Sequence, residues 1–414
     1  MEDYWSNYNQ LVFDSKNPRV NLHEPTFGPD EVMAMTEVML STQVTMGRKV
    51  LEFEKNICNY FNVSEAVTNN SGSSANLLAI SALANIKTYN CLKPNDEVIV
   101  PALSWSTTIW PLIQNNLVPV FVDIDLLTLN IDPQSIEDAI SEKTKALMIV
   151  PVYGNPCDMN SILDICERHN LTLIEDTCES LGASYDNMPL GTFGRVGTFS
   201  FYFSHHITTL EGGVCITNDF DLAETMRILR AHGWVRETKK PEKFLYDNSP
   251  IDSRFLFTNL GYNLRLTEPQ GAMGSIQLPK LDEFVNSRRQ SAQFLLAKLD
   301  SYKSVLNFQQ ETPKGRHSWF GFPMVVKNKA PFSAKEFRNY LENQGIETRP
   351  IIAGDMTQQP ALKLYKHRSS GSLENSSDVM SNGLAIACHQ SLEETALNHM
   401  VDTIDSFMST KDII

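Results

Sequence analysis

The chain has 414 residues, of which 42% are hydrophobic and 20% are charged, and its formal net charge is −14. This length exceeds what one hydrophobic core usually organises, so we expect a large and a smaller domain. The negative charge disfavours nucleic acid as a partner, because nonspecific binding depends on neutralising phosphates with Lys and Arg. No apolar run approaches the roughly 18 residues that span a bilayer, and the first residues do not read as a secretion signal. We therefore expect a cytoplasmic protein without membrane or nucleic-acid partners.

The seven cysteines give no sign of a disulfide framework or a metal site. Their number is odd, no CxxC spacing occurs, and the nearest pairs are Cys157 with Cys166 and Cys166 with Cys178. Cysteines spaced in this way in a chain of this length read as buried hydrophobic residues. We predict no metal site. A small anionic ligand remains compatible with the acidic composition, because backbone N–H groups can build a phosphate pocket.

Short β-branched runs alternate with helical patterns along the first two thirds of the chain. We expect strands at 97–100, 118–124, 146–152, 171–175, 197–203 and 214–217, with helices such as 132–142 and 160–169 between them. This alternation predicts an α/β fold with a mainly parallel sheet that is covered on both faces. Ligands of such sheets bind beyond the carboxyl ends of the strands.

A long helical pattern over 281–299 suits a bridge into a second domain, where we expect a strand at 319–326 and a capped helix at 333–344. We place the boundary near residue 285, within ten residues. The expected organisation is an N-terminal segment (1–25), a large cofactor-binding domain (26–285) and a small C-terminal α+β domain (286–414).

Three features suggest a phosphate-bearing aromatic cofactor, and each also has an ordinary structural explanation. Residues 69–75 read as a turn that feeds a helix, whose free N–H groups attract phosphate, or as a simple helix cap. Asp176 follows an apolar strand, where it could pair with a protonated pyridine nitrogen or cap a helix. Trp105 could stack on a flat ring or belong to the core.

The pair His205-His206 follows the aromatic run Ser200-Phe-Tyr-Phe. By itself, such a pair is more often packed structure than catalyst. Either imidazole could nevertheless move protons near neutral pH. The choice between these two readings depends on the surrounding motifs.

The order of these motifs resembles that of the fold-type-I sugar aminotransferases of the DegT/StrS type, over residues 25 to 400. The shared motifs are Gly-Ser-Ser (72–74), Pro-Ala-x-x-Trp (101–105), Glu-Asp-x-x-Glu-Ser-x-Gly-Ala (175–183), Gly-Thr-Phe-Gly (191–194), Glu-Gly-Gly (211–213), Arg-Ala-His-Gly-Trp (230–234), Gly-Tyr-Asn-x-Arg (261–265), Trp-Phe-Gly-Phe (319–322) and Thr-Arg-Pro-Ile (348–351). The resemblance implies an aspartate aminotransferase-like fold that binds pyridoxal phosphate (PLP) or its amine form, pyridoxamine phosphate (PMP).

The resemblance also implies roles for individual residues. Ser73, Ser74 and Ser200 would hold the cofactor phosphate, Trp105 would stack on the ring, and Asp176 would pair with the pyridinium. Glu179 stands where the aminotransferases usually have Gln. In having Glu at this position, the chain resembles the family's dehydratases. Asn263 matches a residue that reaches the phosphate from a neighbouring subunit, which implies a homodimer with shared active sites.

His205 falls where the family's aminotransferases carry their cofactor lysine. Because imidazole cannot bond covalently to PLP as that lysine does, the resemblance implies a non-covalent cofactor with His205 as its catalytic base. It further implies a nucleotide-sugar 3-dehydratase, with GDP-4-keto-6-deoxymannose as the expected substrate and L-glutamate as the amino donor that regenerates PMP. Candidate substrate contacts are His206, His232, Arg236 and Arg349.

Several alternatives remain open from the sequence. An iron–sulfur 3-dehydratase is disfavoured because no cysteine lies between Cys215 and Cys388. An aminotransferase with another lysine is disfavoured because no lysine lies between Lys145 and Lys239. A noncatalytic PLP or nucleotide-sugar sensor, a GDP-heptose substrate and a CDP-hexose substrate are further possibilities. If His205 were not the base, His206 would be the next candidate.

Overall fold

The computed structural model describes residues 13–244 and 251–413, so the first twelve residues of the predicted N-terminal segment lie outside the described residues. Its centre is a sheet in which eight described strands follow the order β1 (Glu65–Asn69), β9 (Gly213–Thr217), β8 (Val196–Ser200), β5 (Thr172–Asp176), β4 (Thr144–Ile149), β2 (Glu97–Pro101), β3 (Val118–Val122) and β13 (Arg368–Ser369). Among these, β9 alone runs against its neighbours β1 and β8. The mainly parallel α/β fold is therefore confirmed.

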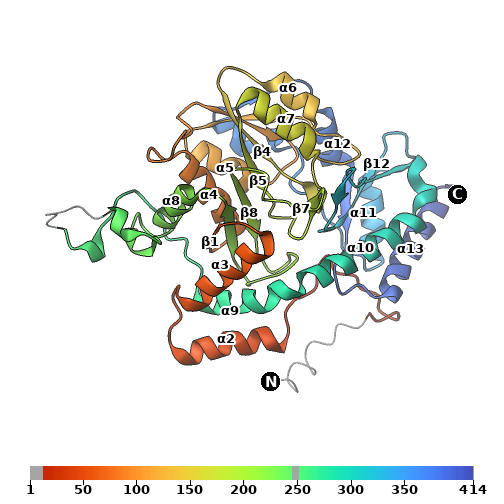
Figure 1. Cartoon of the computed structure of the whole chain (residues 1–414). Coiled ribbons are helices and arrows are strands. Elements are labelled where there is room, and N and C mark those ends of the chain that lie inside the picture. Colours follow the sequence, from red (N-terminus) through yellow and green to blue (C-terminus); the bar gives the residue numbers. More distant parts are fainter. Residues whose placement is uncertain (1–12, 245–250, 414) are drawn as a thin grey trace.

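Helices cover both faces of this sheet because alternate strand residues point to opposite sides. Val98 and Val100 of β2 belong to one core cluster with α4 (Gly72–Leu83), α5 (Ser106–Gln114) and α8 (Phe220–Arg230), whereas Ile99 packs with α6 (Pro133–Ala139) and α7 (Met159–His169) on the opposite face. Figure 1 shows α6 and α7 lying together over the sheet, on its upper side in that view. Burial on both faces explains why these strands read as nearly continuous apolar runs.

Three strands end earlier than the sequence predicts. The run 197–203 leaves the sheet after Ser200, the run 146–152 after Ile149, and the run 118–124 after Val122. In the first case, the chain turns so that the backbone N–H of His205 donates to the carbonyl of Tyr202 at 2.9 Å. The early end of β8 therefore creates the loop that carries His205.

An acidic side chain joins the helices under the sheet. Glu268 begins α9 (Glu268–Gln277), which packs against α2 (Pro29–Ser41) and α3 (Arg48–Phe61). Its buried carboxylate accepts hydrogen bonds from the backbone N–H groups of Gly47, Lys49 and Val50 at 2.8–2.9 Å. The residue before α3, Gly47, has no side chain to cap the helix, so Glu268 supplies the cap from elsewhere in the chain.

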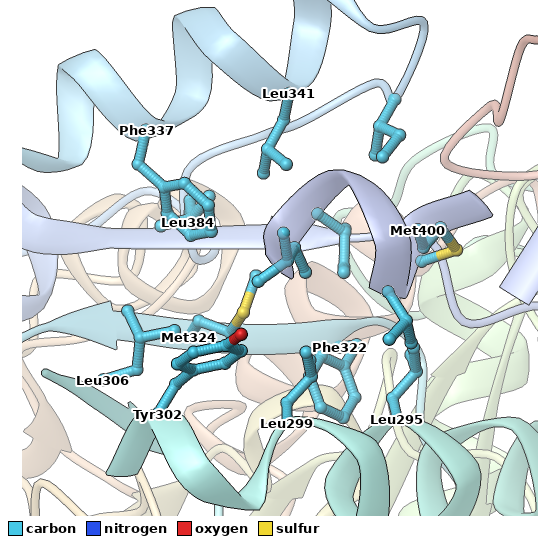
Figure 2. Packing of buried hydrophobic residues seen from close by; sticks show 14 of the residues in the cluster. Leu295, Leu299, Tyr302, Leu306, Phe322, Met324, Phe337, Leu341, Leu384 and Met400 are labelled. Carbon is cyan, nitrogen blue, oxygen red and sulfur yellow. The ribbon is translucent and has the colours of Figure 1, made fainter. Parts of the chain in front are cut away.

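The long helix α10 (Leu281–Lys298) leads from the large sheet to a second, antiparallel sheet of β10 (Leu306–Phe308), β12 (Phe322–Val326) and β14 (Gly383–Ile386). Figure 2 shows the core of this part, where Leu295 of α10 and Leu299, the residue that ends this helix, lie on one side of β12. Phe337 and Leu341 of α11 (Ala334–Asn343) lie on its other side, and α13 (Glu394–Ser409) contributes Met400.

The two ends of the chain complicate the predicted division into domains. Val20, from the N-terminal segment, pairs with Ile346 in the C-terminal part. In the other direction, β13 returns to the large sheet and pairs with β3, and α12 (Glu374–Asn382) follows it. The boundary near residue 285 stays a prediction. No helix in the described ranges is long and apolar enough to cross a membrane.

Candidate active site

A cavity of about 490 Å³ lies beyond the carboxyl ends of β2, β5 and β8, at the start of α4. This is the edge where parallel sheets bind their ligands. Seven of the twelve residues that the sequence pointed to line this cavity, namely Ser73, Trp105, Asp176, Glu179, Ser200, His205 and Arg349. Of the other five, Ser74 and His206 each follow a lining residue in the chain but do not line the cavity themselves. His232, Arg236 and Asn263 belong to a different surface.

The first turn of α4 lies at one end of the cavity. Ser71 caps the helix by accepting a hydrogen bond from the backbone N–H of Ser74 at 3.1 Å, and its hydroxyl also donates to the Ser74 hydroxyl at 3.0 Å. The hydroxyl of Ser73 lies 3.1 Å from that of Thr107. A Cβ atom at Gly72 would lie 2.5 Å from the Cβ of Ser200, so only glycine allows β8 and α4 to approach this closely.

Asp176 is buried, and two neighbouring side chains fix the orientation of its carboxylate. One of its oxygens accepts hydrogen bonds from the Asn76 side-chain amide at 2.8 Å and from the Thr108 hydroxyl at 2.7 Å. The Thr198 hydroxyl donates to the other end of the Asn76 amide at 2.6 Å, which orients that amide. Neither Asn76 nor Thr108 was predicted from the sequence.

Trp105 lies at the mouth of the cavity and is not a core residue. It precedes α5 in an extended conformation, and 52% of its surface is exposed. A large apolar side chain left half exposed beside a cavity can cover a flat ring that binds there. This exposure excludes the alternative of a core tryptophan.

Glu179 and Arg349 form a loose ion pair in the cavity wall, with 3.6 Å between a carboxylate oxygen and a guanidinium nitrogen. The second carboxylate oxygen of Glu179 is buried and has no partner among the described residues. Burial raises the pKa of Glu179 to about 7, although the charge of Arg349 opposes this effect. The carboxyl group therefore changes its charge close to neutral pH.

The imidazole of His205 faces the cavity and packs edge-on against Phe320, with 4.9 Å between the ring centres. Burial, together with the nearby charges of Arg349, Arg288 and His23, lowers the pKa of His205 to about 3. The Nδ1 atom is buried without a partner among the described residues. At neutral pH the ring is therefore uncharged, as a proton-accepting base must be.

The neighbouring ring, His206, does not line the cavity. It is fully buried, and its Nε2 atom donates to the backbone carbonyl of Ser318 at 3.1 Å. Its ring lies on Phe320 at 5.8 Å between centres. Successive residues point in different directions, so only one histidine of the pair faces the cavity.

The segments that follow α8, residues 231–244 and 251–265, project as a lobe from the large sheet (Figure 1), and they contain the exposed residues His232, Arg236 and Asn263. Ala231 and Asn263 pair as an isolated antiparallel bridge, and Arg265 donates to the Asn263 side chain at 3.2 Å. None of the three predicted residues lines the cavity of its own chain.

The residues around the cavity fit a phosphate-bearing aromatic cofactor. The start of α4 offers free N–H groups, the half-exposed Trp105 offers a flat apolar surface, and buried Asp176 offers a fixed negative charge. Within the described residues, no group of His, Cys, Asp and Glu side chains could hold a metal ion, and all seven cysteines are free.

The fold and this arrangement define a fold-type-I, aspartate aminotransferase-like protein. The chain belongs to the DegT/DnrJ/EryC1/StrS aminotransferase family, whose sequence pattern matches residues 25–405. A GDP-4-keto-6-deoxy-D-mannose 3-dehydratase from Yersinia pseudotuberculosis is 40% identical over 372 residues, which are 89% of this chain and 94% of the relative.

Solved structures agree with this assignment. The E. coli GDP-4-keto-6-deoxy-D-mannose-3-dehydratase with bound hydrated PLP is 38% identical, has a TM-score of 0.88, and is matched over 93% of this chain and 99% of that one. A GDP-4-keto-6-deoxymannose-3-dehydratase with a trapped PLP-glutamate geminal diamine is 37% identical, has a TM-score of 0.87, and is matched over 93% of this chain and 100% of that one.

Proposed function

We propose that this chain is a PLP/PMP-dependent 3-dehydratase, which removes the carbon 3 hydroxyl of GDP-4-keto-6-deoxymannose and yields a 4-keto-3,6-dideoxy sugar. The observation that carries the proposal is the uncharged imidazole of His205 in a cavity whose described lining residues include no lysine. The similarity to two dehydratases that act on this GDP-sugar supports the choice of substrate.

Different cavity residues bind different parts of the cofactor, which is held without a covalent bond. When bound as PMP, the cofactor supplies an amine for the 4-keto group and a ring that accepts electrons. The N–H groups at the start of α4, with the hydroxyls of Ser73 and Ser200, bind phosphate, and Trp105 covers the ring. Asp176, whose carboxylate is held in place by Asn76 and Thr108, would pair with the protonated ring nitrogen.

His205 performs the proton transfers. Its uncharged ring accepts a proton from the methylene carbon next to the cofactor amine, and the resulting imidazolium then donates that proton to the departing hydroxyl at carbon 3. One residue can serve both steps because proton uptake precedes the loss of the hydroxyl. After hydrolysis of the dehydrated sugar adduct, the products are the 4-keto-3,6-dideoxy sugar, ammonia and PLP.

L-Glutamate returns the cofactor to its amine form, and Arg349 is the candidate contact for its carboxylate. The guanidinium lies in the cavity wall and makes only a loose pair with Glu179, so it can bind a second carboxylate. The solved relative with PLP and glutamate supports this donor.

The functional unit is a homodimer in which each cavity is completed by the second chain. Asn263, His232 and Arg236 lie on a lobe that does not reach the cavity of its own chain. The same lobe exposes Phe255 (60%), Phe257 (54%) and Leu260 (91%), an apolar surface that a second copy would cover. Asn263 then contacts the phosphate of the neighbouring site.

Mass spectrometry of the products tests the proposed reaction. The enzyme, PLP and L-glutamate should convert GDP-4-keto-6-deoxymannose into a sugar that is lighter by one oxygen atom, with one ammonia released per turnover. The CDP-linked hexose and a GDP-linked 4-keto heptose are assayed in parallel to test substrate choice. Binding of PLP without consumption of any sugar or of glutamate would favour a noncatalytic sensor instead.

A further inference from the structure

A short segment of the C-terminal part, residues 317–320, is held by side chains at every backbone carbonyl. Arg289 Nη1 donates to the His317 carbonyl at 2.8 Å, His206 Nε2 to that of Ser318 at 3.1 Å, and Arg288 Nη1 to those of Trp319 and Phe320 at 3.2 Å each. The donors come from α10 and from the loop after β8. The 317–320 segment is therefore fixed from both parts of the molecule.

The backbone of this segment needs such support. Trp319 has a φ of 49°, in the left-handed region that a bulky side chain adopts only at a cost of about 1–3 kcal/mol. The strained residue directly precedes Phe320. A small relaxation at Trp319 would therefore move the ring of Phe320.

Phe320 is the contact between this segment and the active site. Its ring lies 4.9 Å from that of His205, and the guanidinium of Arg349 lies 5.4 Å from its centre. It also contacts Tyr153, with 5.7 Å between ring centres. The position of Phe320 thus sets how far the imidazole of His205 can rotate.

Arg288, which binds the 317–320 segment, differs from the other buried arginines in having no carboxylate partner among the described residues. Its side chain is 2% exposed, and no carboxylate among the described residues pairs with it. The other buried arginines behave differently, since Arg227 and Arg230 both pair with glutamates. The charge of Arg288 is compensated by carbonyl oxygens instead, including that of Cys388 at 2.6 Å.

We propose that Arg288 is a positioning residue for the dehydration: its guanidinium holds the carbonyls of Trp319 and Phe320, and Phe320 in turn holds the imidazole of His205. This role rests on the proposed function, because it concerns the base of that reaction. Arg288 itself touches neither cavity nor substrate. A lysine at this position would keep the charge but lose the fork that serves several carbonyls at once.

Kinetics of three variants and a double variant test this chain of contacts. Arg288→Lys and Phe320→Leu should each lower kcat about tenfold or more, while KM for the nucleotide sugar stays within about twofold, because misplaced catalytic groups mainly affect kcat. The double variant should be no slower than Phe320→Leu alone, because both changes interrupt the same contact. Arg227→Lys is the matched control, a buried arginine far from the cavity, and should keep the wild-type kcat.

A second readout needs no turnover. In cofactor-free protein labelled at histidine, the ring-proton signal of His205, identified by its loss in His205→Asn, should move in Arg288→Lys and stay in place in Arg227→Lys. This signal still reports on Arg288 if the wild type proves to have no dehydratase activity.

Three outcomes would overturn the proposal. The first is an unmoved His205 signal in a folded Arg288→Lys variant, and the second is independent, multiplying losses of kcat in the double variant. If Arg288→Lys does not fold, Phe320→Leu decides alone, and a wild-type kcat of that variant is the third.

Discussion

The carboxylate of Glu179 lies 3.6 Å from the guanidinium of Arg349, yet burial keeps its pKa near 7 instead of letting the cation lower it. The same surroundings hold the pKa of His205 at about 3. Around neutral pH, the carboxyl group is thus the titrating member of this site and the imidazole stays uncharged.

The Glu179→Gln variant should reveal the raised pKa of Glu179 through a change in the pH dependence of folding stability. A carboxyl whose pKa is raised on folding stabilises the folded state fully below its unfolded pKa, near 4.5, and this contribution is lost as pH rises through about 7. The amide does not titrate. The cofactor-free variant should therefore gain stability over the wild type between pH 5 and pH 8, by at most a few kcal/mol. Thermal unfolding of both proteins at the two pH values measures it, and a constant difference in Tm would contradict the raised pKa.

The same variant should also change the pH profile of the reaction. We expect the wild-type kcat to bend near pH 7, where Glu179 titrates, because its charge state alters the field at Arg349. Glu179→Gln should remove this bend. A bend that persists unchanged in the variant would assign the titration to another group.

Asp176→Asn should lower kcat about a hundredfold or more, since the change removes the charge that stabilises a protonated ring nitrogen. The amide has nearly the same shape, so the hydrogen-bond partners Asn76 and Thr108 can remain in place. Steady-state kinetics with a PMP titration measures the effect. Full activity at saturating PMP would show that Asp176 has no electrostatic role.

Mixing two inactive dimers tests whether the sites are shared. His205→Asn and Asn263→Ala each damage every site of their own dimer. If Asn263 serves the neighbouring cavity, a mixed dimer contains one intact site, so subunit exchange should restore activity. If each cavity is built from one chain, mixed dimers carry one lesion per site and the mixture stays inactive.

Glu268→Ala should destabilise the protein by about 1–3 kcal/mol, because three backbone N–H groups at the start of α3 lose their acceptor. Denaturant unfolding gives this difference. Glu283→Ala, an exposed glutamate on α10, is the control and should change stability by less than about 0.5 kcal/mol. Equal effects of the two substitutions would deny Glu268 its capping role.

The sequence predicts the parts of this fold whose signals are local. Strands such as β4 and β5 are buried on both faces and read as apolar runs, so their places in the chain, and with β5 that of Asp176, could be predicted, although β4 ends three residues earlier than predicted. Trp105 follows from the same reasoning, whereas the role of Ser200 was implied only by the resemblance to the family. The cap that Glu268 provides to α3 could not be predicted, because the two elements are more than 200 residues apart in the chain.

The residues that support Asp176 could not be predicted either, because they too lie far from it in the sequence. Asn76 sits within an apolar helix run and Thr108 within α5, and only the folded chain brings both to Asp176. His206 shows the opposite case, since its place beside His205 in sequence suggested a role in the cavity. Its ring instead supports the 317–320 segment through Ser318.

The products of His205→Lys test the central claim most directly, namely that histidine in the place of the cofactor lysine makes this site a dehydratase. With GDP-4-keto-6-deoxymannose, PLP and L-glutamate, mass spectrometry should find an aminated sugar from the variant and a deoxygenated 4-keto sugar from the wild type. The variant should also show the absorbance of PLP bound covalently to lysine. A variant that keeps the full wild-type rate of deoxygenation would contradict the role of His205.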